Sequence, residues 1–193
     1  MRKLEGIVEK ILITPSGEKV SMEVDSGEIT FEGLEGDCHS GLTLISHGRQ
    51  PEYPKGTVIS NLRQITILSA EELADIAADL QIPELDISWL SGNILVSGSP
   101  HLSLLPFGSR ILFSGGVVLI CSGENNPCST PAKIVQSLYP EKTEISREFV
   151  RAAMHRRGIV AWVEHPGRIN PGESFRIELP AAWDPIWVEN EAS

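Results

Sequence analysis

Cys128 is the residue whose position in the sequence best suits reactive chemistry. It lies two residues before Thr130, and Thr130 followed by Pro131 is typical of a helix N-terminus. The unpaired N–H groups and the positive dipole end of such a helix stabilise a thiolate. The thiolate is the form of cysteine that attacks electrophiles and binds metals. From position alone, an inert cysteine in a loop is an equally good interpretation.

An acid and a histidine lie together in a short glycine-flanked segment, residues 36–41. Asp37 can orient the ring of His39, and His39 can then transfer protons. The same composition also suits a plain tight turn, because glycine tolerates the backbone angles that turns need. The segment therefore predicts either a proton-transfer site or a turn.

The other cysteines carry weaker signals. A zinc site built from Cys38, His39 and Cys128 is disfavoured, because adjacent Cys and His are not a usual zinc spacing. Cys121 lies in an apolar strand pattern and is expected to be a buried filler. The role of Cys38 is left open.

Several arginines could bind an anion. Residues 125–180 contain eight Lys or Arg against six acids, a local balance of +2. Arg151, Arg156 and Arg157 are close in this segment, and Arg63 begins a strand after a long loop. Guanidinium groups bind phosphate and carboxylate bidentately. The alternatives are surface ion pairs within a helix and a charge that protects a sheet edge. The long loop offers further contacts from His47, Arg49 and Lys55.

Short strands and a few helices must position these groups. Strands are expected at residues 6–14, 20–31, 61–68, 93–96, 101–105, 109–113, 117–122, 159–164 and 174–179. The predicted helices cover 70–80, with Ser69 and Glu72 forming a capping box, 131–138, and 144–154 with Gly158 ending it. Residues 33–60 have no periodicity, and a loop of that length suggests function. The many short strands predict a mostly β sandwich or barrel in one domain, residues 1–193.

Composition narrows the class of protein. The chain has 193 residues, with 16 basic and 26 acidic side chains, and a net charge of −10. This charge argues against nucleic acid and anionic membranes as partners. Three cysteines imply no disulfide framework, and no targeting or spanning segment is recognisable, so a cytoplasmic location is expected. Whether Trp183 and Trp187 pack on the barrel or on a second subunit is left open, as is the oligomeric state.

Several motifs, taken in order, resemble the MOSC-domain family, named for the C-terminal domain of molybdenum cofactor sulfurase. The match looks closest to small standalone bacterial members and extends over about residues 30–178. The motifs are Gly36-Asp37-x-His39-x-Gly41, residues 61–73 (NLRQITILSAEEL), residues 92–98 (GNILVSG), Gly108-Ser109-Arg110, residues 121–128 (CSGENNPC), Arg157-Gly158-Ile159-Val160-Ala161, Gly167 and Pro171-Gly172-Glu173.

The resemblance implies a closed or partly open β-barrel similar to that of pyruvate kinase, with a few short peripheral helices. It also implies binding of the molybdenum cofactor, a molybdenum-carrying pterin with a terminal phosphate. The family cysteine corresponds to Cys128, as molybdenum ligand or persulfide carrier, and Asp37 and His39 would line the site. The candidate cofactor-binding residues are Arg63, Asn93, Arg151, Arg157 and Gly158.

Three activities are compatible with this resemblance. The first is a molybdoenzyme that reduces small N-hydroxylated or N-oxygenated substrates, or transfers sulfur through Cys128, with a redox or sulfur-donor protein as partner. The second is a carrier that binds the cofactor without turnover. The third is a metal-free cysteine nucleophile assisted by His155 or His165. Pyridoxal phosphate, found in fused relatives, is not expected. Many relatives have paired histidines in the first loop, whereas Ser40 follows His39 here, so a two-histidine proton relay is in doubt.

Overall fold

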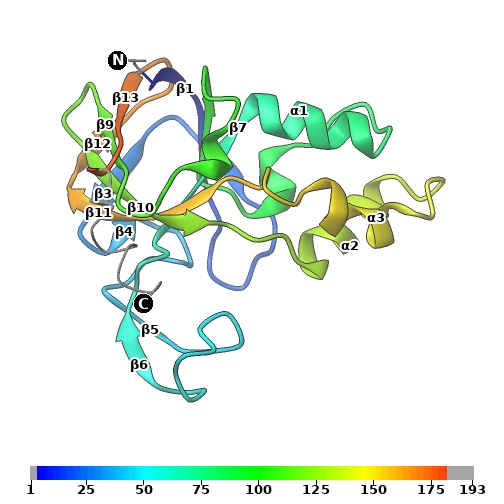
Figure 1. The fold of residues 1–193 in the computed structure, drawn as a ribbon, viewed down its shortest axis with the longest axis horizontal. Helices are drawn as coiled ribbons and strands as arrows, with labels where there is room; N and C mark the ends of the chain where they lie inside the picture. The colour runs from blue at the N-terminus through cyan, green and yellow to red at the C-terminus, as the bar shows by residue number, and fades with distance from the viewer. Residues whose placement is uncertain (1–3, 182–193) are drawn as a thin grey trace, which may run out of the picture.

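The computed structural model describes residues 4–181, which form a closed β-barrel flanked by three α-helices (Figure 1). Seven strands close the barrel in the order β13-β9-β10-β11-β7-β8-β1, and β13 pairs with β1. In chain order these are β1 (Leu4–Ile13), β7 (Ile65–Ser69), β8 (Ile94–Ser97), β9 (Arg110–Phe113), β10 (Val118–Glu124), β11 (Ile159–His165) and β13 (Ser174–Glu178). The predicted mostly β barrel is confirmed. Trp183 and Trp187 lie outside the described residues.

Six shorter strands lie outside the closed ring. β2 (Met22–Val24) extends the sheet from β1, while β3 (Gly27–Thr30), β4 (Gly33–Leu34) and β12 (Gly167–Ile169) form a small second sheet. β5 (Thr43–Ile45) and β6 (Val58–Ser60) form a hairpin that extends away from the barrel (Figure 1). We call residues 42–60 the arm. The long loop predicted at residues 33–60 is thus partly ordered by two short strand pairings.

Two apolar cores hold the fold together. The first fills the barrel with side chains such as Ile67, Ile94 and Val163, which point inward from successive strands. The second lies between the barrel wall and the helices, where Leu68 packs near Ile76 and Phe149. Adjacent residues of β7 therefore serve different cores, and all five residues of that strand are buried.

The helices are α1 (Ala70–Asp79), α2 (Ser129–Leu138) and α3 (Ile145–Ala152). Ser69 caps α1 as predicted, because its side chain accepts a hydrogen bond from the Glu72 N–H. The second half of the predicted capping box is wrong. The Glu72 carboxylate instead accepts hydrogen bonds from the N–H and hydroxyl of Ser103, which draw it into the interior.

Other predicted boundaries also move. The strand predicted at 101–105 is a 3-10 turn, η2 (Leu102–Leu104), and a second one, η1 (Ile87–Leu90), follows α1. The single strand predicted at 20–31 is divided into β2 and β3. α3 ends at Ala152, six residues before Gly158. Among residues 4–181, no helix is both long and apolar enough to cross a membrane.

Candidate functional site

A cavity of about 550 Å³ opens beside the barrel where several sequence-distant segments meet. Its walls come from Cys38 and His39, from the arm, from the chain entering β7, from η1 and from the N-terminus of α2. This volume is in the range of ~300–1,000 Å³ that small-molecule sites occupy. The cavity brings Cys128, His39, Arg63 and Arg157 together.

Cys128 is itself the N-cap of α2, two residues earlier than the cap predicted at Thr130. Its backbone is extended, with φ −143° and ψ 176°, and its side chain makes no capping hydrogen bond. The thiol is half-buried and lines the cavity, and Arg49 Nη2 donates to its Sγ at 3.3 Å. The sulfur is therefore available to a ligand, next to a positive charge and a helix N-terminus.

Arg157 is the most deeply buried cation of the cavity, with only 5% of its surface exposed. Its Nη2 donates to the Leu90 carbonyl at 2.6 Å, while Nε and Nη1 are buried without a hydrogen-bond partner among residues 4–181. Burial lowers the pKa of this guanidinium to about 10, so it stays charged at neutral pH. Unpaired buried donors of this kind are costly unless a ligand satisfies them.

Arg63 completes a group of three cavity-lining arginines. Its Nη2 donates to Asn125 Oδ1 at 3.2 Å, and burial together with the neighbouring Arg49 lowers its pKa to about 10. No Asp or Glu among the described residues lines this cavity. In a chain of net charge −10, these three guanidinium groups without a facing carboxylate make the cavity locally positive.

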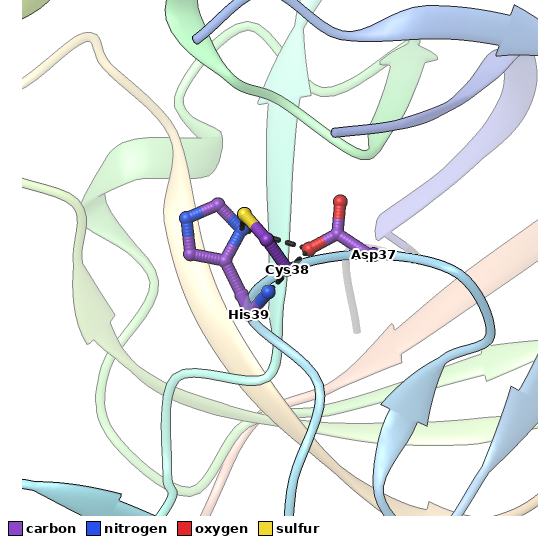
Figure 2. Close-up of side chains that lie close together, drawn as sticks. All are labelled: Asp37, Cys38 and His39. Carbon is purple, nitrogen blue, oxygen red and sulfur yellow. Dashed lines mark hydrogen bonds and ion pairs between the residues drawn. The ribbon is translucent and has the colours of Figure 1, made fainter. Parts of the chain in front are cut away.

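Asp37, which was expected to line the site, does not line the cavity; it instead holds the ring of His39, which does (Figure 2). Asp37 Oδ1 bonds to the backbone N–H of His39 at 2.8 Å and to its Nδ1 at 2.7 Å. Asp37 Oδ2 accepts from the Thr14 N–H and from Asn93 Nδ2, each at 2.7 Å. Burial opposes ionisation of this carboxyl group, but the hydrogen bonds from His39 and Thr14 outweigh it and lower its pKa.

The Asp37, Cys38 and His39 side chains lie close enough to suggest a metal site, with their ligand atoms within 4.8 Å of one another. Both Asp37 oxygens, however, are already engaged by four hydrogen bonds. Burial, followed by the charge of Asp37, raises the pKa of Cys38, whose Sγ lies 3.6 Å from His39 Nδ1. A protonated thiol and a saturated carboxylate are poor ligands. The group therefore positions a histidine rather than holding a metal.

Three of the residues predicted to bind a cofactor do not line the cavity. Arg151 lies on α3 with 83% of its side chain exposed and pairs with Glu148. Asn93 is fully buried and joins Asp37 to the barrel through the Thr66 N–H and the Leu12 carbonyl. Gly158 lies just before β11 and packs tightly against the backbone of Ile67 in β7. Its positive φ of 74° favours glycine at this position.

Sequence reasoning missed two parts of the site. Asn125 is buried and accepts a hydrogen bond from Arg63. Its position in the sequence did not indicate this role. Trp89, Leu90 and Ser91 line the cavity from η1. Only long-range packing brings η1 to α2, so no local pattern could have indicated this wall. The strand placement of Cys121 is confirmed, since it is fully buried in β10.

The MOSC domain model matches residues 54–176 of this chain. The chain belongs to the MOSC domain family. It is 38% identical over 176 residues to a Bacillus subtilis (strain 168) protein named "Putative metal-sulfur cluster biosynthesis proteins YuaD", covering 91% of this chain and 92% of that protein. The crystal structure of YuaD from Bacillus subtilis superposes with a TM-score of 0.88 over 91% of this chain and 97% of that one.

More distant structures share the fold alone. YiiM from Escherichia coli is 14% identical, with a TM-score of 0.57 over 95% of this chain and 72% of that one. YiiM from Geobacillus stearothermophilus is 13% identical, with a TM-score of 0.56 over 97% of this chain and 84% of that one.

Proposed function

We propose that the cavity binds the molybdenum cofactor, with the Cys128 thiolate as a ligand to the metal and arginines as ligands to the phosphate. The single observation that carries this proposal is the pairing of a cavity-facing thiol with an acid-free arginine group. A soft thiolate suits a metal that already has sulfur ligands. Membership of the MOSC domain family, which is associated with this cofactor, supports the same assignment.

The residues of the cavity fit such a group on their own evidence. The two unpartnered nitrogens of Arg157 are buried donors that a phosphate oxygen would satisfy. Arg49 already donates a hydrogen bond to the sulfur of Cys128. Its positive charge would therefore lie beside an anionic metal–sulfur group bound at Cys128 and would stabilise it. When bound, the cofactor would supply a redox-active metal that the Cys128 thiolate, at the N-terminus of α2, would ligate.

The chain's own residues then have separate tasks. Cys128 would ligate the metal, while Arg157 and Arg63 would orient the phosphate end of the cofactor. His39, held by Asp37, is the group best placed to move a proton at the cavity wall. The activity we propose is the reduction of small N-hydroxylated or N-oxygenated molecules. For a hydroxylamine this consumes two electrons, supplied by a partner redox protein, and two protons, and it yields an amine and water.

A second candidate, sulfur carriage by Cys128, is favoured by the accessible thiol beside Arg49 and by the metal-sulfur wording of the name of the YuaD relative. In this reaction the Cys128 thiolate attacks the terminal sulfur of a donor persulfide. A new S–S bond forms at Cys128 as the donor S–S bond breaks, the terminal sulfur keeps its proton, and the donor leaves as a thiolate. Arg49 would stabilise the attacking anion.

The test is the molybdenum and pterin content of the protein purified from a host that makes the cofactor. We expect both in the wild type, loss of molybdenum in Cys128→Ala, and about tenfold or greater weakening of cofactor binding in Arg157→Gln, because a charged hydrogen bond is worth ~1.5–3 kcal/mol. Arg151→Gln is the matched control, an exposed arginine outside the cavity, and should retain the wild-type content.

The alternatives give different results in the same experiment. Wild-type protein without molybdenum or pterin would contradict the proposal. A cofactor that is retained without any reductase turnover would indicate a carrier. Rapid alkylation of Cys128 at saturating cofactor would indicate a metal-free nucleophile. A persulfide on Cys128, detected by mass spectrometry and absent from Cys128→Ala, would support sulfur carriage.

A further inference from the structure

Two histidines, His39 and His47, line the cavity from different parts of the chain. His39 lies in the turn after β4, and His47 lies in the arm, between β5 and β6. The sequence put a two-histidine relay in doubt because Ser40 follows His39. His47, eight positions after His39, brings a second histidine to the same cavity.

The hydrogen bond of His39 to Asp37 determines which ring nitrogen carries the proton. An ionised carboxylate can only accept hydrogen bonds, so Nδ1, 2.7 Å from Asp37 Oδ1, must be the N–H of the neutral ring. Nε2 is then the unprotonated nitrogen. It lies on the side of the ring away from Asp37 (Figure 2), and it has no hydrogen-bond partner among residues 4–181.

His47 has the opposite arrangement. Its Nδ1 lies 3.4 Å from the backbone N–H of Arg49, which can only donate. Nδ1 must therefore be the acceptor, so the neutral His47 ring carries its proton on Nε2. That N–H also has no acceptor among the described residues.

We infer that His39 and His47 form an acceptor–donor pair in this cavity, with an unprotonated Nε2 on His39 and a protonated Nε2 on His47. The first ring can accept a hydrogen bond from a ligand in the cavity, such as water, a hydroxyl or an amine, and the second can donate one. The pair also lets the cavity take up a proton at one wall and deliver a proton at another. The inference deepens the proposed function by assigning these two proton roles, but it holds for the protein without cofactor.

The test is ¹⁵N NMR of the histidine rings in the cofactor-free, full-length protein at alkaline pH, where imidazoles are neutral. His39→Gln and His47→Gln assign the resonances among the five histidines. We expect His39 to show a protonated Nδ1 and an unprotonated Nε2, and His47 to show the reverse. The same tautomer on both rings, or averaged signals from either ring, would overturn the inference.

Asp37→Asn provides a sharper second arm. Two fixed donors, the Thr14 N–H and Asn93 Nδ2, face Oδ2, whereas one, the His39 backbone N–H, faces Oδ1, so we expect the amide oxygen to take the Oδ2 position. The amide NH₂ then replaces Oδ1 and donates to His39 Nδ1. We expect the His39 tautomer to invert, with the proton moving to Nε2, while His47 stays unchanged. A His39 ring that keeps its proton on Nδ1 would contradict the expected inversion and the orientation of the residue 37 amide on which it depends. Neither arm depends on molybdenum content, so a failure here is distinguishable from failure of the proposed function.

Discussion

Single residues of this protein gain their chemical character from burial and from what lies opposite them. Cys38 and Cys128 both line the cavity, yet burial and Asp37 raise the pKa of Cys38 while Arg49 donates to Cys128. The sequence indicated Cys128 through its place before a helix. It left the role of Cys38 open, because the partners of a thiol come from distant parts of the chain.

Glu72 makes the stability of the protein depend on pH in an unusual direction. Burial raises the pKa of this carboxyl group from 4.5 to about 7, and hydrogen bonds from Ser103 only partly offset it. The folded state thus binds more protons than the unfolded state between these values, and its stability falls as pH rises through this window. Glu72→Gln mimics the neutral acid, so we expect it to stabilise the protein by about 1–3 kcal/mol above neutral pH and to remove this slope. Urea unfolding at several pH values measures both.

The control for this prediction is Glu71→Gln at the neighbouring position. Burial opposes ionisation of Glu71 as well, but hydrogen bonds from Ser69 and Gly98 outweigh it and lower the pKa of the group. Its contribution to stability is present at neutral pH and is lost on acidification, the opposite sign to that of Glu72. Equal pH slopes in Glu72→Gln and the wild type would contradict the account of Glu72.

Gly158 should tolerate no side chain, for steric rather than chemical reasons. It has a φ of 74°, and a Cβ would overlap the Ile67 carbonyl oxygen in the facing strand. We expect Gly158→Ala to cost more than about 2 kcal/mol of unfolding free energy. Gly172→Ala is the matched control, with a φ of 83° but no atom within 4 Å, and should cost only about 1–2 kcal/mol. Equal losses of unfolding free energy in the two variants, measured by thermal unfolding, would contradict a steric overlap at position 158.

At the scale of elements, local signals predicted much of the framework but not the walls of the site. The apolar face and Ser69 cap predicted α1 because helix formation there depends on neighbours in sequence. α2 begins two residues earlier than the Thr130-Pro131 signal suggested, since Cys128 adopts the extended cap conformation. The barrel closure between β1 and β13 joins the two ends of the described chain, which no short-range pattern encodes.

The arm is expected to contribute to binding and little to folding. Residues between β5 and β6 bring His47 and Arg49 to the cavity, and no residue of the arm belongs to either apolar core. Replacing residues 47–56 with an Asn-Gly turn should keep the unfolding temperature within a few degrees of the wild type while cofactor content falls at least about tenfold. Differential scanning calorimetry and metal analysis measure the two effects.

A point variant separates the shape of the arm from its charge. Arg49→Gln keeps the loop but removes the guanidinium from Cys128, and it should show most of the loss in cofactor content. Full cofactor content in the shortened arm would contradict a binding role for this element. Unfolding of the shortened protein would show instead that the arm supports the barrel.

Over the whole molecule, the net charge of −10 conceals an uneven distribution. The segment 125–180 carries +2 and the rest of the chain −12, and the cavity gathers Arg49, Arg63 and Arg157 without a carboxylate. Composition alone therefore argued against nucleic acid and anionic membranes without excluding a small anion. The fold concentrates positive charge at one place by joining the arm, the entry to β7 and the turn before β11.

The central claim is that the sulfur of Cys128 binds molybdenum, and X-ray absorption at the molybdenum edge tests it most directly. The spectrum of the loaded wild-type protein should show one more sulfur atom coordinated to molybdenum than the spectrum of the Cys128→Ser variant loaded in the same host. Arg151→Gln, which alters a charge outside the cavity, should match the wild type. An identical sulfur shell in the wild type and Cys128→Ser would contradict the claim.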